Sequence, residues 1–157
     1  TNSEFLIDRG TLRADGGSSY LYGIVSRGGT LTVTNTLFTA TGGGSAIGFS
    51  IEGGSAAIAH TTMVFGDMRR SYGFSVGDLR RFSLYNSQLH RLGAAGSEDH
   101  TLLYLEGSVQ ELSIAGNNAS GWQRLLTDGA AARRSWGLTS PGVDPSAPRK
   151  SRKPCVL

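Results

Sequence analysis

Four acidic residues stand where they could cleave a polysaccharide. Each follows an apolar stretch of the chain, and the four are Asp8, Glu52, Asp78 and Glu106. Glycosidases need two carboxyl groups about 5–9 Å apart, a separation that residues on nearby coils of a repetitive fold could reach. The four positions are offset from one another, and Arg27 and Gly77 interrupt the column that they would form. We therefore expect solvated or ion-paired carboxylates, and we assign no catalytic residue.

The residues that bind metals in proteins do not form a set in this sequence. Zinc and similar ions need three or four convergent ligands. His60 falls in a polar column of the repeat, while His90 and His100 fall in a long loop region without shared spacing. Cys155 is the only cysteine, which excludes an internal disulfide framework and a multi-thiolate site. We predict neither a metal nor a cofactor.

Three arginines are candidates for contact with a ligand. Arg69 and Arg70 are adjacent, with Arg80 nearby, and together they form the one dense cationic spot outside the C-terminal tail. This spot could contact an anionic glycan. Arginines that flank a turn are also common as solvated surface residues without a ligand, so this second interpretation stays open beside the functional one.

Three tyrosines complete the set of binding candidates. Tyr20, Tyr22 and Tyr72 each lie just before a predicted strand. A tyrosine has an apolar ring and a polar hydroxyl group, so a cluster of them could stack against sugar rings. The same tyrosines could instead cover a corner or cap the interior of the fold. The predicted partner is a polysaccharide or a surface protein.

A repeat of about 25 residues must position these side chains. Gly-Ile-Val-Ser at 23–26 recurs as Gly-Phe-Ser-Ile at 48–51 and as Gly-Phe-Ser-Val at 73–76. A second motif of alternating apolar and small residues recurs at 31–33, 56–58, 82–84 and 112–114. Such alternation indicates strands with one buried face. The 23 glycines against four prolines also favour a turn-dense β protein.

Equivalent residues of successive repeats fall into columns of similar chemistry. Asn35, His60 and Asn86 form one column, which we expect to lie at an inward bend and to hydrogen-bond along the axis of the fold. Opposite charges also recur at the repeat offsets. These pairs are Arg27 with Glu52 and Arg81 with Glu111. Cross-strand pairs of this kind specify register more than they stabilise the fold.

The repeat is expected to extend beyond its clearest copies. Residues 5–12 match residues 24–31 at an offset of 19, which predicts an earlier partial copy and a solenoid that starts at or before the first residue. Residues 122–126 are expected to form one more strand. The period lengthens to 30 between the third and fourth copies. We place the surplus in the loop at 93–100, since insertions in solenoids commonly carry their binding surface.

This pattern predicts the fold class. A 25-residue unit has no room for the helices of ankyrin or tetratricopeptide repeats, and it lacks the framework of leucine-rich repeats. With its Gly-apolar start, turn and second apolar strand, the unit resembles the right-handed parallel β-helix superfamily, the pectate-lyase-like group, over about residues 5–126. The resemblance implies an all-β, right-handed parallel β-helix solenoid of about 4–5 coils. That scaffold hosts lyases, hydrolases, tailspikes and adhesins alike.

The charges divide the chain into a body and a tail. Residues 131–157 contain six basic residues and one acidic residue, whereas residues 1–130 contain nine basic and eleven acidic residues. We predict a parallel β-helix over 1–130 and a basic, disordered tail over 131–157. The body lacks the cationic face of a nucleic-acid-binding protein. No apolar run approaches the roughly 20 residues of a membrane span. We expect no nucleic acid and no membrane span.

These observations favour a non-catalytic module for binding or structural display. We expect it outside the cell or at the cell surface of a bacterium, or on a phage, and we expect it to be directed at a glycan. One alternative is a polysaccharide lyase or glycoside hydrolase, or a fragment of one. Another is a segment of a trimeric fibre or tailspike. Open strand edges at the N-terminal end also predict a homo-oligomer or a capping partner.

Overall fold

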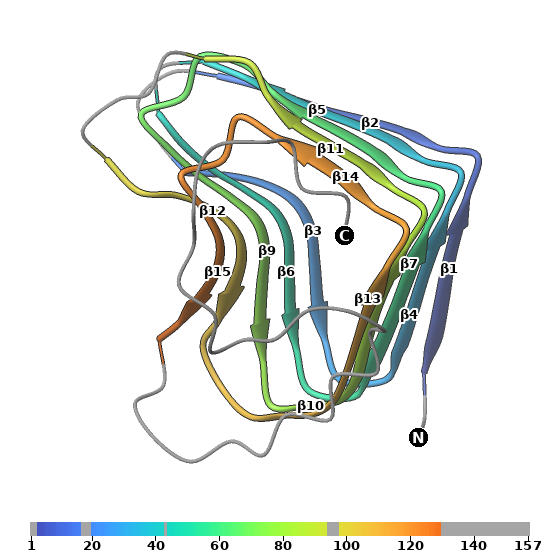
Figure 1. The fold of residues 1–157 in the computed structure, drawn as a ribbon. Coiled ribbons are helices and arrows are strands. Elements are labelled where there is room, and N and C mark those ends of the chain that lie inside the picture. Colours follow the sequence, from blue (N-terminus) through green and yellow to red (C-terminus); the bar gives the residue numbers. More distant parts are fainter. Residues whose placement is uncertain (1–2, 17–19, 43, 94–97, 130–157) are drawn as a thin grey trace.

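The computed structural model describes residues 3–16, 20–42, 44–93 and 98–129, and these ranges contain strands and no helix. In these described ranges, fifteen strands form three parallel sheets of five strands each (Figure 1). Sheet A contains β1 (Glu4–Asp8), β4 (Thr30–Thr34), β7 (Ser55–Ala59), β10 (Leu79–Tyr85) and β13 (Val109–Ala115). Sheet B contains β2 (Thr11–Asp15), β5 (Leu37–Thr41), β8 (Thr62–Phe65), β11 (Gln88–Arg91) and β14 (Asn118–Ser120). Sheet C contains β3 (Tyr20–Arg27), β6 (Ser45–Glu52), β9 (Arg70–Gly77), β12 (His100–Leu105) and β15 (Arg124–Asp128).

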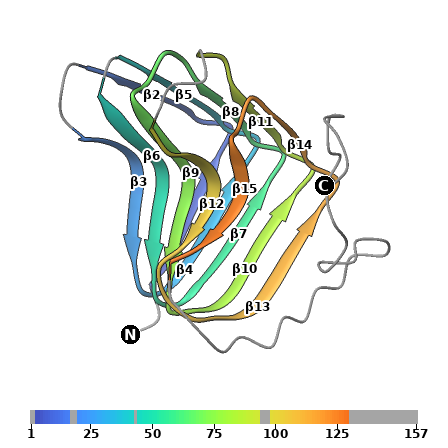
Figure 2. The same cartoon turned by 60° about the vertical axis from the view of Figure 1, so that its left-hand side comes forward.

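The chain passes through the three sheets in turn and forms a β-solenoid of about four turns (Figure 2). Each strand pairs in parallel with its equivalent one turn away. Ile24 lies beside Phe49, and Phe49 lies beside Phe74, so the repeat in the sequence is a stack in space. The prediction of an all-β parallel solenoid is confirmed. β15 confirms the additional strand that we expected near residues 122–126.

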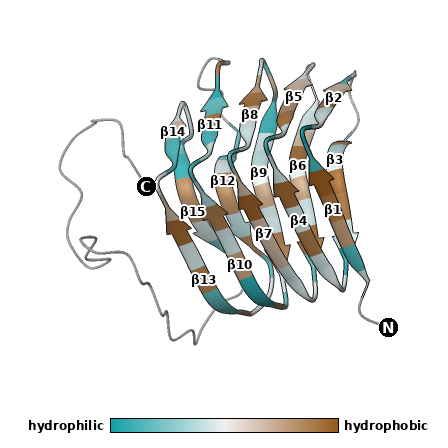
Figure 3. Cartoon of the chain, turned by 90° about the vertical axis from the view of Figure 1, so that its right-hand side faces the viewer, coloured by the Kyte–Doolittle hydropathy of each residue, from teal (hydrophilic) through white to brown (hydrophobic). Residues whose placement is uncertain are grey.

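Apolar columns fill the interior of the solenoid. Figure 3 shows apolar segments at matching places in neighbouring strands. Phe49 and Phe74 are fully buried, and their ring centroids lie 5.5 Å apart. Phe74 also packs against Phe82 of sheet A, with a centroid distance of 5.6 Å. Fully burying a side chain of this kind contributes about 1.5–3 kcal/mol. The aromatic stack therefore holds neighbouring turns and different sheets together.

The corner between sheets A and B corrects one prediction. Asn35, His60 and Asn86 do form a column, but their side chains are exposed and their backbone φ angles are 50°, 51° and 48°. Asn and His tolerate this left-handed conformation better than most non-glycine residues. Gly116 follows in the same column with φ 68°. The column reflects a repeated backbone turn, and it is not an inward ladder.

The inward polar ladder lies one residue later along the chain. Thr36, Thr61, Ser87 and Asn117 are all buried. The Thr61 amide donates to Ser87 Oγ at 3.2 Å, and the Ser87 amide donates to Asn117 Oδ1 at 2.9 Å. Asn117 Nδ2 donates to the Leu84 carbonyl oxygen at 2.8 Å. The hydroxyl groups of Thr36, Thr61 and Ser87 donate within their own turn, to the carbonyl oxygen two residues earlier. The amides of Thr61 and Ser87 and the Asn117 side chain bond to a neighbouring turn, so the expected ladder exists at a different column.

The register also corrects the expected alignment at the N-terminus. Phe5 pairs with Leu31 and Ile7 with Val33, which is an offset of 26 and not 19. The offset of 19 matched β1 of sheet A with β3 of sheet C, two strands that both alternate apolar residues. β1 and β2 are thus the sheet A and sheet B strands of the first turn.

The surplus residues of the longest repeat lie mainly where we expected them. The register offset is 26 between β8 and β11, 29 between β9 and β12, and 30 between β10 and β13. Three of the four additional residues therefore lie between β11 and β12, in agreement with the predicted insertion at 93–100. The fourth lies between β12 and β13.

The glycine that opens the repeated motif is required by packing. A Cβ atom at Gly48 would lie 2.2 Å from Met63 Cε and 2.6 Å from the Gly73 carbonyl oxygen. At Gly23 it would lie 2.3 Å from the Phe38 ring. No ordinary side chain tolerates such contacts, so glycine lets the sheet C strands lie close to the core.

Two further predictions concern a membrane span and the C-terminal tail. Within the described residues, no helix has the length and apolar character that a membrane crossing requires. The predicted basic tail at 131–157, with Cys155, lies outside the described residues.

Candidate functional site

Five of the six predicted binding residues lie on or beside sheet C. They are Tyr20 and Tyr22 of β3, Arg70 and Tyr72 of β9, and Arg69 immediately before β9. The strand register places Tyr20 in line with Arg70, through Ser45 of β6. We had expected the tyrosines just before the strands, and this was wrong, because all three lie within β3 or β9. Arg80 lies in β10 of sheet A and does not join this group.

Tyr20 and Tyr22 form an exposed aromatic pair. Their ring centroids lie 6.5 Å apart with an interplanar angle of 26°, and the residues are 55% and 50% exposed. Leu21 between them packs against the core. Because side chains alternate along a strand, both tyrosine rings stand on the outer face of sheet C. This pair offers flat apolar surface to solvent.

Tyr72 is held more firmly than the other two tyrosines. It is partly buried, and its ring centroid lies 5.3 Å from that of Tyr104. Its hydroxyl group donates to Asp99 Oδ2 at 3.4 Å. Burial raises the pKa of the Tyr72 phenol, and the Asp99 carboxylate raises it further, so the phenol stays protonated as a donor.

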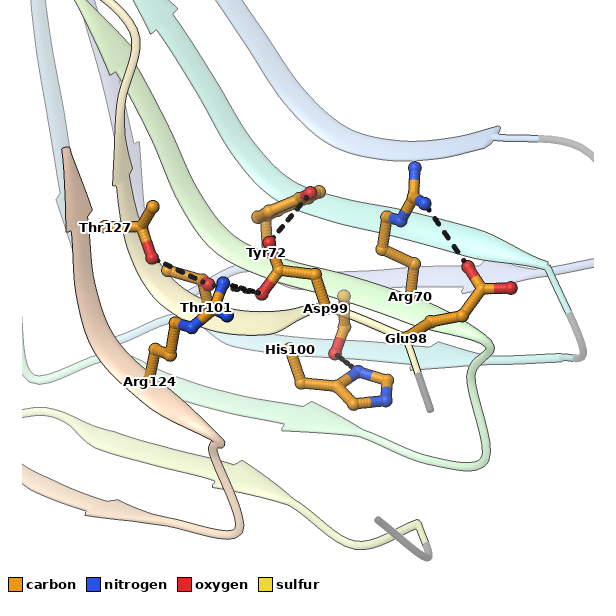
Figure 4. A network of polar contacts seen from close by, with 9 residues as sticks. Arg70, Tyr72, Glu98, Asp99, His100, Thr101, Arg124 and Thr127 are labelled. Atoms are coloured by element: carbon orange, nitrogen blue, oxygen red, sulfur yellow. Dashed lines mark hydrogen bonds and ion pairs between the residues drawn. The ribbon is translucent and has the colours of Figure 1, made fainter. Parts of the chain in front are cut away.

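Glu98 forms ion pairs with both of the adjacent arginines that the sequence marked as a cationic spot. One carboxylate oxygen lies 3.4 Å from Arg69 Nε, and the other lies 3.4 Å from Arg70 Nη2. Figure 4 shows Arg70 and Glu98 facing each other. Both arginines therefore already have an anionic partner within the chain.

Asp99 is the centre of a second group of contacts on the same face. Its Oδ1 accepts a hydrogen bond from the Thr101 hydroxyl at 2.8 Å and an ion-pair contact from Arg124 Nη1 at 3.3 Å (Figure 4). Thr101 also lies 3.2 Å from the Thr127 hydroxyl. We define the sheet C cluster by its charged residues and Tyr72. Its members are Arg69, Arg70, Tyr72, Glu98, Asp99 and Arg124.

The four carboxylates first considered for catalysis are spread over the molecule. Asp8 belongs to sheet A, and Glu52 ends β6, 3.8 Å from Arg27. Asp78 accepts hydrogen bonds from Ser108, while Glu106 accepts one from the Ser75 hydroxyl at 2.6 Å. Each of the four thus makes hydrogen bonds or an ion pair within the chain. Both predicted charge pairs are also confirmed. Arg27 pairs with Glu52, and Arg81 pairs with Glu111 at 2.6 Å.

The histidines occupy three different environments. His60 is exposed at the corner between sheets A and B, and His90 of β11 contacts the Ser120 hydroxyl at 2.8 Å. His100 is fully buried at the start of β12. His90 and His100 thus lie in strands, which corrects their expected place in a loop. In the described part of the chain, no three potential metal ligands gather in one place.

Sequence reasoning missed Glu98, Asp99 and Arg124 as site residues. The two acidic residues lie at the end of the inserted segment, which has no equivalent in the other turns, so no column could identify them. The available signal was the insertion itself, whose acidic character and surface location were both apparent.

Comparison with known proteins finds no relative of this chain. No protein-family model matches the chain, and no curated protein or solved structure matches it. The candidate site of this parallel β-solenoid is therefore argued from its own geometry.

Proposed function

We propose that this chain is a non-catalytic binding module that holds an uncharged polysaccharide on the outer face of sheet C. The observation that carries the proposal is the exposed, stacked pair of Tyr20 and Tyr22 beside the sheet C cluster. Aromatic rings offer apolar faces to the C–H surfaces of sugars, while their hydroxyl groups form hydrogen bonds. The proposed place of action is outside the cell or at its surface.

The charges on this face favour an uncharged ligand over an anionic one. Glu98 already engages Arg69 and Arg70, and Asp99 engages Arg124. A polymer with carboxylate groups would have to displace these partners or lie beside them, and like charges in contact are unfavourable. Sugar hydroxyl groups can donate to the carboxylates and accept from the arginines without breaking the ion pairs.

Kinship with the pectate-lyase-like group remains part of this proposal. The parallel stacking of three sheets agrees with that group, and the glycine-led motif resembles its units. A shared scaffold does not imply a shared activity, however. We therefore base the proposed function on the tyrosine pair and its charged neighbours.

Affinity electrophoresis would test the proposal. The protein would migrate through native gels that contain galactomannan, xyloglucan or hydroxyethyl cellulose, and through gels with polygalacturonate or alginate. We expect retardation by at least one uncharged polymer and its loss in the double variant Tyr20→Ala/Tyr22→Ala. Tyr85→Ala is the matched control, since Tyr85 is 36% exposed on sheet A.

Four results would count against the proposal. Migration unaffected by every polymer, or retardation that survives the double variant, would remove the role of the tyrosine pair. Release of new reducing ends from a polymer would instead support the lyase or hydrolase alternative. A mass of three chains by light scattering, without polysaccharide binding, would support the trimeric fibre.

A further inference from the structure

A buried histidine lies behind the sheet C cluster. His100 follows Asp99 in the chain and has no solvent exposure. Its Nδ1 lies 2.8 Å from Ser71 Oγ, but its Nε2 is buried and has no hydrogen-bond partner among the described residues. Buried polar atoms are bonded in the great majority of cases. The ring is therefore accommodated in the interior as the neutral imidazole, whose second nitrogen can remain without a proton.

The charged groups around His100 shift its pKa in opposite directions. Burial lowers the pKa of His100, and the Arg91 cation lowers it further, while the carboxylates of Asp99 and Glu98 raise it in part. Arg91 enters the interior from β11, is only 4% exposed, and has Asp67 as its own charged neighbour. The two carboxylates are engaged on the outer face by the arginines of the cluster. The net effect disfavours a positive charge on the ring.

Protonation of His100 would disturb the backbone next to the site. The imidazolium would hold a second N–H group without an acceptor, close to the cation of Arg91. A movement at the start of β12 would carry the ring out of this environment. Two backbone hydrogen bonds fix that start, from the Ser71 amide to the Asp99 carbonyl oxygen at 3.2 Å and from the Gln123 amide to the His100 carbonyl oxygen at 3.1 Å.

We propose that His100 couples the sheet C cluster to pH, so that its protonation displaces the start of β12 and withdraws the Asp99 carboxylate from Tyr72, Thr101 and Arg124. A ligand held on this face would then be released in acid. The release rests on the proposed function, whereas the displacement of β12 does not. The two can therefore be tested separately.

Hydrogen exchange followed by NMR tests the displacement. The readouts are the protection factors of the Ser71 and Gln123 amides, corrected for the intrinsic pH dependence of exchange. The open state binds a proton with the ordinary affinity of histidine, and the closed state binds it more weakly, so acid favours opening. We expect protection to fall by up to about tenfold for each pH unit below the ordinary titration range of histidine.

The substitution His100→Leu should remove this response. Ala46 and Leu21 occupy the equivalent positions one and two turns before Ser71, so the column accepts apolar side chains. His100→Gln is a second uncharged variant in case the leucine variant folds poorly. His60→Gln is the matched control, since His60 is exposed, and it should retain the wild-type response.

Distinct outcomes overturn the two parts. Protection that does not change with pH in the wild type, or that falls equally in both His100 variants, would exclude a role for His100. If protection falls but electrophoretic retardation by galactomannan is the same at neutral and acidic pH, the coupling to the ligand is wrong. If no polysaccharide binds at any pH, the proposed function fails while the exchange result still decides the behaviour of β12.

Discussion

The Asp8 carboxylate accepts a hydrogen bond from Asn35 Nδ2 at 2.9 Å, across one turn of the solenoid. Thr34 donates a second one at 2.8 Å. These hydrogen bonds to the ionised form, that of Asn35 first, lower the pKa of Asp8 from 3.8 to about 2. The corner between sheets A and B is thus held by a side chain of the first turn.

The depressed pKa of Asp8 predicts a defined response to acid. Because the folded-state value lies below the unfolded value, the stabilising contribution is complete above the ordinary pKa and is lost as the pH falls through about 2. NMR titration of the side-chain carboxyl carbon should give a midpoint well below 3.8. In Asn35→Ala the midpoint should rise toward that value. An unchanged midpoint would show that Asn35 does not hold the carboxylate.

The left-handed corner predicts different effects for two substitutions of Asn86. Its φ angle is 48°, which a β-branched residue tolerates poorly. We expect Asn86→Val to lower the free energy of unfolding by roughly 1–2 kcal/mol. Asn86→Gly should be close to neutral, since Gly116 adopts φ 68° at the equivalent position. Urea unfolding measures both, and equal midpoints for the two variants would contradict the assignment.

The close packing of the repeated glycine predicts a destabilising Gly48→Ala substitution. Its new methyl group would contact Met63 and the Gly73 carbonyl oxygen. Overpacking of this kind commonly lowers stability by about 1–3 kcal/mol. Gly77→Ala is the matched control, because the nearest atom to its Cβ would lie 3.5 Å away. Thermal unfolding should separate the two, and a Gly48→Ala midpoint as high as that of the control would refute the prediction.

The inward ladder predicts a large difference between two neighbouring asparagines. Asn117→Ala would leave the buried amide of Ser87 without its acceptor, at a cost of about 1–3 kcal/mol. Asn118→Ala removes only an exposed contact with Gln88, and surface changes of this kind usually stay within about 0.5 kcal/mol. Chemical denaturation compares them directly. A similar loss in both variants would mean that the ladder does not stabilise the corner.

The stacking of the turns could be predicted from the sequence, but the direction of every side chain could not. The period of 25 residues correctly aligned Ile24, Phe49 and Phe74, because a parallel solenoid stacks equivalent positions. It could not distinguish an inward asparagine from one in a left-handed turn. Asparagine suits both roles, and Asn35 proved exposed while Asn117 proved buried.

The candidate site was only partly accessible to sequence reasoning. Tyr20 and Tyr22 were selected by residue type, and the register brought them near Arg70. Arg80 was included for its nearness in sequence, which a solenoid does not convert into nearness in space. Glu98 and Asp99 occur once, in the inserted segment, and a method based on repetition cannot recognise a feature that occurs once.

The parallel pairing of every strand with its equivalent one turn away has a mechanical consequence. Each layer of the molecule is supported only by the layer above and the layer below, so its folding behaves as a one-dimensional chain of coupled units. Fraying at either end shortens the stack and leaves the remainder intact. A destabilising substitution in a central layer, such as the one that contains Phe74, instead divides the stack into two short pieces. Each piece then has a newly uncovered surface.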